Sequence, residues 1–158
     1  MMSSSLASST NQRLDAARRL LVQSQQEEGE WLMNSYESSA VFQLRSGLNG
    51  LLQEVMASYN LSCQVDIDVM VRASKEKGIA VPVLLELMQL KSSRQSWLSQ
   101  LLYTFDAVLE CRAANQAYSA AGNVELIGRG SDAGGSTKHI LSSLTELVLR
   151  FREDAAEY

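Results

Sequence analysis

The sequence predicts an all-α protein, an up-and-down bundle of four long helices with one or two short ones. Residues that interrupt helices are scarce: the chain has one proline, and five of its nine glycines fall between Gly122 and Gly135. Along most of the remainder, apolar residues recur at intervals of three and four, which places them on one face of a helix. The alternation of β-branched and aromatic residues that marks strands is nearly absent.

The chain is long enough for one folded domain, which we place at residues 10–158. Its 158 residues are 46% apolar and 20% charged, an ordinary balance for a globular protein. A chain of this size buries enough surface to fold without a disulfide or a structural metal. Residues 1–9 are rich in serine and are predicted to be disordered, and a glycine-rich loop is expected at about residues 120–137.

The first two helices are predicted from apolar spacing and from the residues at their ends. The first is expected to begin after Ser9 or Thr10 and to end near Glu28, where Gly29 is a suitable stop. The second, over residues 30–59, has the clearest amphipathic pattern. The apolar face of the first helix comprises Leu14, Ala17 and Leu21, and that of the second comprises Val41, Leu44, Leu48, Leu51, Leu52, Val55 and Tyr59.

Two glycines occupy the interior of the second helix, where each costs about 1 kcal/mol relative to alanine. Gly47 and Gly50 share a stripe of small residues with Ala40 and Ala57. We hypothesise that another helix crosses closely at this stripe, because packing at the level of the backbone would offset the cost of the glycines.

After the second helix the sequence predicts shorter elements. Asp66 or Asp68 would cap a short helix that ends at Lys77, although residues 65–67 could instead form a short extended segment. Pro82 suits the first turn of the next helix, because its missing N–H would have no partner there in any case.

Two further helices complete the predicted bundle. One is expected from Arg94 to about Tyr118, capped by Ser92 or Ser93, and the last is expected to begin after residues 136–137. The apolar face of the former comprises Trp97, Leu98, Leu101, Leu102, Phe105, Val108 and Leu109, and that of the latter comprises Ile140, Leu144, Leu147, Val148 and Phe151.

No motif predicts catalysis, so we expect no catalytic, cofactor-binding or metal-binding residues and no cofactor. The segment Gly128–Lys138 comes nearest to a phosphate-binding loop, but its order Gly-Gly-Ser-Thr-Lys departs from the P-loop, and helical sequence precedes it. His139, the only histidine, has no partner at metal-ligand spacing and is expected at the surface. Cys63 and Cys111 are expected to be reduced and half-buried thiols, with Cys111 packed on its helix.

Two other groups of residues are better explained by structure than by chemistry. The segment Arg112–Tyr118 is faintly similar to the arginine-to-histidine motif of HEPN-type helical ribonucleases. Tyrosine stands where that family has histidine, so the group that would transfer a proton is missing. The larger aromatic residues are expected to pack in the core or between helices. These residues are Trp31, Tyr36, Trp97 and Phe105.

We expect a cytoplasmic protein that neither enters a membrane nor binds nucleic acid. The N-terminal residues lack the basic and apolar regions of a secretory signal. The longest nearly continuous apolar run, Ile79–Leu85, is far shorter than the roughly 20 residues that span a bilayer. With a net charge of −4 and scattered basic residues, the chain offers no cluster that would neutralise phosphates.

Several segments of the chain together resemble a known family. These segments are Thr10–Leu14, Glu37–Leu44 with the following Gly47–Val55, Ser96–Leu98 and Arg150–Glu153. They resemble a family of short, uncharacterised bacterial α-helical proteins that is classed as a domain of unknown function. The chain departs from that family at Ala120–Lys138, where the family is variable. The resemblance implies a small cytoplasmic helical protein, and it brings no established catalytic residues.

The sequence leaves the function open among three classes. The leading interpretation is a non-catalytic helical module that binds a protein partner or a second copy of itself. The alternative is a degenerate HEPN-like, nucleic-acid-associated regulator without nuclease activity, which would hold Arg112 and Tyr118 in a basic groove. A third class, a binder of small ligands, requires an enclosed apolar pocket of at least about 300 Å³.

The close crossing at the small-residue stripe predicts that Gly47→Leu destabilises the protein. A leucine side chain would overpack the crossing, which typically costs about 1–3 kcal/mol. Thermal unfolding followed by circular dichroism should give a lower Tm for this variant. Gln53→Leu, on another side of the same helix, is the control and should leave Tm nearly unchanged. A neutral effect or a higher Tm for Gly47→Leu would contradict the crossing.

Overall fold

The computed structural model describes residues 2–112 and 133–156, and the prediction of an all-α protein is confirmed there. These residues form six helices and no strand. The helices are α1 (Met2–Gln26), α2 (Glu30–Tyr59), α3 (Ile67–Glu76), α4 (Pro82–Ser92), α5 (Trp97–Leu109) and α7 (Ala133–Ala156).

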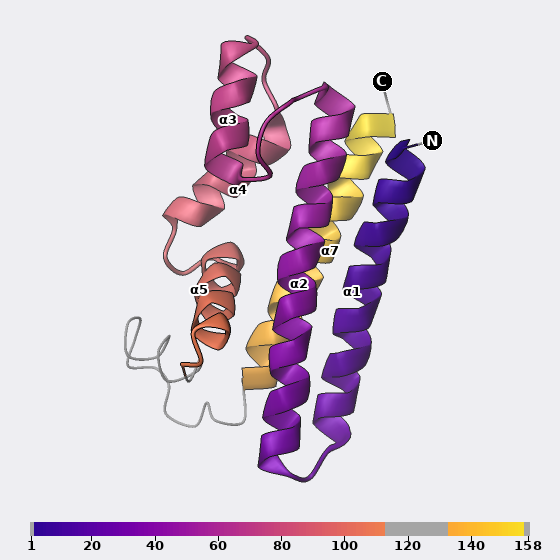
Figure 1. Cartoon of the computed structure of the whole chain (residues 1–158), viewed down its shortest axis with the longest axis vertical. Coiled ribbons are helices and arrows are strands. Elements are labelled where there is room, and N and C mark those ends of the chain that lie inside the picture. The colour runs from indigo at the N-terminus through magenta and orange to yellow at the C-terminus, as the bar shows by residue number, and fades with distance from the viewer. Residues whose placement is uncertain (1, 113–132, 157–158) are drawn as a thin grey trace.

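Three long helices form the frame of the molecule. α1, α2 and α7 lie side by side, with α1 antiparallel to the other two (Figure 1). α5 packs against α2 and α7, and α3 and α4 form a hairpin that adjoins it. The prediction of four long helices is not confirmed. Three helices are long: α1 has 25 residues, α2 has 30 and α7 has 24. In place of a fourth long helix the chain forms two short ones, α4 with 11 residues and α5 with 13.

Local sequence explains several of the helix ends. α2 has the predicted bounds: it begins after Gly29 and ends at Asn60, which adopts the left-handed conformation with a φ of 58°. Asp66, one of the two predicted caps, begins α3 by accepting a hydrogen bond of 3.0 Å from the backbone N–H of Val69. Pro82 occupies the first turn of α4, as predicted.

The start of α1 differs from the prediction. The helix begins at Met2, so residues 2–9, predicted to be disordered, are helical. The hydroxyl of Thr10 donates back to the carbonyl of Leu6 at 3.1 Å inside the helix, so it does not serve as a cap. Thr10 is fully buried, and Arg152 of α7 donates to the carbonyl of Ala7 at 3.2 Å. Contacts with other helices therefore hold this segment in place.

The helix predicted from Arg94 begins three residues later, at Trp97. Its cap is Ser96 rather than residues 92–93, because the hydroxyl of Ser96 accepts a hydrogen bond of 3.1 Å from the backbone N–H of Ser99. A short turn therefore separates α4 from α5.

α5 also ends earlier than predicted, at Leu109 instead of Tyr118. Cys111 has a positive φ of 61°, a left-handed conformation that is typical just beyond a helix end. Tyr118 and most of the predicted loop at residues 120–137 lie outside the described residues. The last helix begins at Ala133, so the end of that loop is helical.

One hydrophobic cluster includes buried side chains from all six described helices. Its largest fully buried members are Leu44, Leu48, Leu51, Leu52, Met70, Leu84, Leu87, Leu98, Leu101, Leu144 and Leu147. Burying a leucine side chain contributes about 1.5–3 kcal/mol, so this cluster is the main source of stability. Many of these residues belong to the apolar faces predicted from spacing.

α1 contacts α2 closely at the two glycines of α2. A Cβ atom at Gly50 would lie 2.5 Å from Thr10 Oγ1 and 3.3 Å from Thr10 Cα. A Cβ atom at Gly47 would lie 3.3 Å from Leu14 Cδ2. The hypothesis of a close helix crossing is therefore confirmed at these two glycines, whereas Ala57 is exposed and takes no part in it.

We predict that Gly50→Ala destabilises the protein by about 1–3 kcal/mol, although alanine is the better helix former. The new methyl group would overlap Thr10 Oγ1, which is 2.5 Å away. Urea unfolding at 25 °C measures the change in the free energy of unfolding.

The double variant Thr10→Ala/Gly50→Ala should recover part of the loss, because Oγ1 is gone; Thr10→Ala alone completes the cycle. Equal stabilities of Gly50→Ala and the unmodified protein would contradict the close contact.

Candidate functional site

A buried ion pair joins the three long helices. Arg152 of α7 donates two hydrogen bonds to Glu54 of α2, from Nε to Oε1 at 3.0 Å and from Nη2 to Oε2 at 3.1 Å. The same guanidinium donates to Asn11 Oδ1 at 2.8 Å and to the carbonyl of Ala7 at 3.2 Å, both on α1. Only 7% of the surface of Glu54 is exposed. Because these groups bond to one another across three helices, we interpret the network as structural.

A second polar contact places the start of α7. Thr137 Oγ1 donates to Glu37 Oε1 of α2 at 3.0 Å. Burial raises the pKa of Glu37, and the hydrogen bond from Thr137 partly opposes that rise. The other buried hydroxyls, on Thr10, Ser24 and Ser74, donate to backbone carbonyl groups. The bonds of Ser24, Glu54 and Thr137 therefore connect helices, whereas those of Thr10 and Ser74 lie within their own helices.

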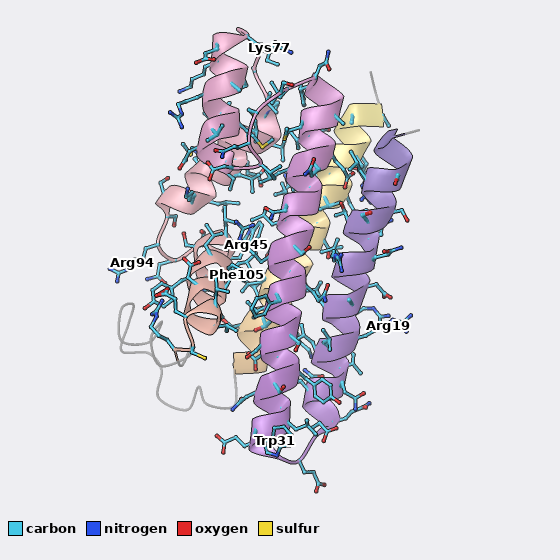
Figure 2. The ribbon with its side chains drawn as sticks, in the orientation of Figure 1. Arg19, Trp31, Arg45, Lys77, Arg94 and Phe105 are labelled. Atoms are coloured by element: carbon cyan, nitrogen blue, oxygen red, sulfur yellow. The ribbon has the colours of Figure 1, made fainter. Side chains whose placement is uncertain are left out.

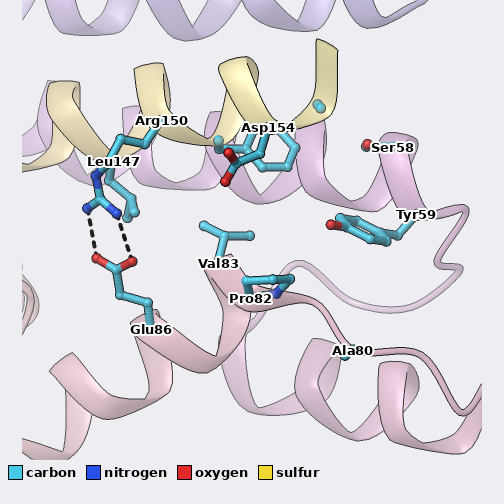
Figure 3. Close-up of a pocket in the computed structure, with 11 residues that line it drawn as sticks. Ser58, Tyr59, Ala80, Pro82, Val83, Glu86, Leu147, Arg150 and Asp154 are labelled. Atoms are coloured by element: carbon cyan, nitrogen blue, oxygen red, sulfur yellow. Dashed lines mark hydrogen bonds and ion pairs between the residues drawn. The ribbon is translucent and has the colours of Figure 1, made fainter. Parts of the chain in front are cut away.

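A pocket of about 530 Å³ lies at the end of the bundle where α2 and α7 terminate. It is formed by the last residues of α2, the first turns of α4 and the last turns of α7 (Figure 3). Its apolar wall comprises Tyr59, Pro82, Val83, Leu147, Phe151 and Ala155. Ala80 and Asp154 are exposed at its edge, so the pocket is open to solvent. The small-ligand class predicted from the sequence requires an enclosed cavity, and this pocket is not enclosed.

The polar side of the pocket carries one cation and two carboxylates. Arg150 donates from Nη1 to Glu86 Oε1 at 3.0 Å and from Nη2 to Glu86 Oε2 at 2.8 Å (Figure 3). These hydrogen bonds lower the pKa of Glu86 and raise the pKa of Arg150. Asp154 lies one helical turn beyond Arg150 on the same face of α7. Two carboxylates against one guanidinium leave the lining with a net negative charge.

The pocket offers an apolar surface beside a negatively charged edge. Its lining contains neither histidine nor cysteine. In the described ranges, 2–112 and 133–156, no group of three or more His, Cys, Asp or Glu side chains could hold a metal ion.

An arginine and two phenylalanines pack between α2 and α5. The rings of Phe42 and Phe105 meet edge to face, with centroids 5.1 Å apart and an interplanar angle of 77°. The guanidinium of Arg45 lies 5.7 Å from the centroid of Phe105 (Figure 2). Burial lowers the pKa of Arg45. Phe105 thus packs between helices, as predicted, and the contacts stabilise the α2–α5 pair.

The exposure of Trp31 contradicts the prediction that it packs in the core or between helices. It lies in the first turn of α2, and 75% of its surface is exposed (Figure 2). Figure 1 shows the reason: the first turn of α2 extends beyond the start of α7, so α7 does not cover Trp31. Among the described residues, the other exposed large apolar side chains are Val22, Met33, Phe42, Leu85, Leu109 and Leu149. No described helix combines the length and the hydropathy needed to cross a membrane.

The residues that the sequence singled out for chemistry do not come together. His139 is exposed on α7, as predicted. Cys111 is exposed, contrary to the prediction of a packed thiol, because it lies just beyond the end of α5. Arg112 is also exposed and forms an ion pair with Glu110 at 3.1 Å. Tyr118 lies outside the described residues, so the HEPN-like interpretation stays a prediction.

The remaining candidates have structural roles or fall outside the described residues. Asp66 caps α3, and Asp68 forms an exposed ion pair with Lys91 at 2.8 Å. Residues 128–132 of the glycine-rich segment Gly128–Lys138 lie outside the described residues, and from Ala133 onward the segment belongs to α7.

The charged residues of the pocket were not predicted. Glu86 and Arg150 are 64 residues apart in the sequence, and nothing in the local pattern pairs them. The one available signal is the four-residue spacing of Glu146, Arg150 and Asp154, which places three charged side chains on one face of the last helix.

Comparison with known proteins connects the chain to a family. The model of a family described as a family of unknown function (DUF6586) matches residues 1–158. The match confirms the resemblance to a domain of unknown function. No curated protein and no solved structure matches the chain.

We predict that Arg150→Met raises the pKa of Glu86 toward its ordinary value of 4.5, because the hydrogen bonds that lower it are removed. Since the pKa is lowered in the folded protein, the pair stabilises the fold above pH 4.5, and this contribution is lost as the pH falls further. For a partly exposed pair it amounts to less than about 1 kcal/mol.

An NMR titration of the side-chain carboxyl carbon of Glu86 measures this shift. Arg19→Met, which removes an exposed arginine of α1, is the control and should leave the midpoint of Glu86 unchanged. The same midpoint in Arg150→Met and in the unmodified protein would contradict the pairing.

Proposed function

The chain belongs to the DUF6586 family of unknown function, and we propose that it is a non-catalytic, cytoplasmic protein-interaction module. In this proposal it binds a protein partner or a second copy of itself through the end of the bundle that carries Trp31. The observation that carries the proposal is the exposure of 75% of the surface of this tryptophan.

An exposed tryptophan is a strong potential anchor for a partner. Burying most of an indole removes on the order of 150 Å² from water, which is worth about 4 kcal/mol at 25 cal/mol per Å². Tryptophan is also enriched among the residues that dominate binding energy at protein interfaces. Met33, two residues along the chain, exposes 37% of its surface and adds apolar area to the same end of α2.

Trp31 is presented on an ordered backbone. The hydroxyl of Ser24 on α1 donates to the carbonyl of Met33 at 3.0 Å, across the α1–α2 turn. The N–H of Met33 donates to the carbonyl of Gly29 at 2.9 Å. Because the turn is held in this way, little backbone entropy would be lost when a partner binds.

The polar groups and the thiols of the chain also support a structural and cytoplasmic role. Glu54 and Thr137, the buried polar residues with side-chain partners, are engaged in bonds between helices. Cys63 is a half-buried free thiol, and Cys111 is an exposed one. Free thiols persist most readily in a reducing compartment.

We predict that Trp31→Ala weakens the interaction by about tenfold or more, which corresponds to the loss of an interface anchor. Analytical ultracentrifugation measures self-association of the purified protein, and affinity purification of the tagged chain from its native host measures partner binding. Leu85→Ala is the control, because Leu85 is also a large exposed apolar residue but lies on α4. Circular dichroism should show the same helix content in all three proteins.

Either self-association or one stoichiometric partner, kept by Leu85→Ala and weakened by Trp31→Ala, would support the proposal. A protein that stays monomeric at all concentrations and recovers no stoichiometric partner would contradict an interaction module. An interaction that Trp31→Ala leaves unchanged would contradict the role given to this end of α2.

A further inference from the structure

The pocket at the ends of α2 and α7 has the dimensions of a site for a small molecule. Its volume of about 530 Å³ lies within the roughly 300–1,000 Å³ that is typical of such sites. Val83 and Phe151 in its wall are 8% and 7% exposed, and Tyr59 is half-buried. Because these side chains are held by the surrounding helices, the pocket presents a formed apolar surface to a ligand.

The charges of the lining decide which class of molecule fits. Both carboxylate oxygens of Glu86 bind the guanidinium of Arg150, so an anionic ligand would have to displace Glu86. Asp154 forms no hydrogen bond or ion pair with any residue in the described part of the chain, although it interacts electrostatically with Arg150, one helical turn away. Figure 3 shows its side chain extending from α7 on the side of Val83.

A cation would find two favourable partners in this pocket. The carboxylate of Asp154 offers an opposite charge, and its attraction is not already satisfied by a salt bridge within the described residues. The ring of Tyr59 lines the same pocket and offers a face to a positive charge. The excess of carboxylates over guanidinium in the lining therefore favours a positively charged ligand.

We propose that this pocket binds a small organic ammonium ion, with its apolar body against Val83 and Phe151 and its ammonium group beside Asp154. A small molecule with an apolar body can contact the apolar wall and Asp154 at the same time. This site goes beyond the proposed interaction function and is independent of it, because Trp31 lies at the other end of α2.

Three probes of similar shape and different charge test the proposal on the full chain: 4-phenylbutylammonium, 4-phenylbutan-1-ol and 4-phenylbutanoate. Titrations followed by the methyl NMR signals of Val83 and Leu147 report binding in the pocket. We expect the ammonium ion to bind most tightly, and Asp154→Asn to weaken its binding about threefold, as for a partly exposed ion pair.

Two variants accompany these titrations. Glu153→Gln removes the same charge from the neighbouring exposed position of α7, outside the pocket, and should leave the binding of all probes unchanged. Ala80→Phe should fill the mouth of the pocket and abolish the binding of all three probes.

Several results would overturn the proposal. Equal binding of the three probes would show a site that recognises apolar shape alone, and tightest binding of 4-phenylbutanoate would show recognition by Arg150. No methyl shifts with any probe, or no effect of Asp154→Asn, would also overturn it. Tighter binding of N-acetyl-lysine N-methylamide than of 4-phenylbutylammonium would identify a protein lysine as the occupant. None of these results depends on Trp31 or its partner.

Discussion

The direct contact between α1 and α2 at Gly50 is the constraint on which the rest of the structure depends. Because Gly50 has no side chain, Thr10 approaches the backbone of α2 and becomes fully buried. This contact fixes the position of α1 along α2, and at this position the carbonyl of Ala7 accepts a hydrogen bond from Arg152. Arg152 in turn binds Glu54, about one helical turn beyond Gly50 on α2. A single small residue thereby aligns all three long helices.

The aligned frame carries two different surfaces at its opposite ends. Trp31 lies in the first turn of α2, and the pocket adjoins the last residues of the same helix. A helix of 30 residues is about 45 Å long at 1.5 Å per residue, so the two surfaces are well separated. One is an exposed aromatic side chain, for which we propose a protein partner, and the other is a recess, for which we propose a small cation. The two ends can therefore be occupied independently.

The parts of the fold that could be predicted are those whose cause is local in the sequence. The bounds of α2, the cap of α3 at Asp66 and the position of Pro82 in α4 all depend on residues within about one turn. Two of the predictions that were wrong, for residues 2–9 and for Trp31, concern residues whose surroundings come from a distant helix, whereas the bounds of α5 were missed although Ser96, its cap, is local. Arg152 of α7 bonds to the carbonyl of Ala7 in the first turns of α1, and Trp31 is exposed where α2 extends beyond the start of α7.

The sequence by itself determined the helical class of the protein and the apolar face of each long helix, because a spacing of three and four residues is a local property of the chain. Only the tertiary structure decided where polar side chains meet. Glu86 and Arg150 are 64 residues apart, and they pair because the fold places α4 opposite the last turns of α7 across the pocket. Arg152 and Glu54 are 98 residues apart and meet across the close α1–α2–α7 contact. Such pairs depend on how the helices are aligned, which no local pattern specifies.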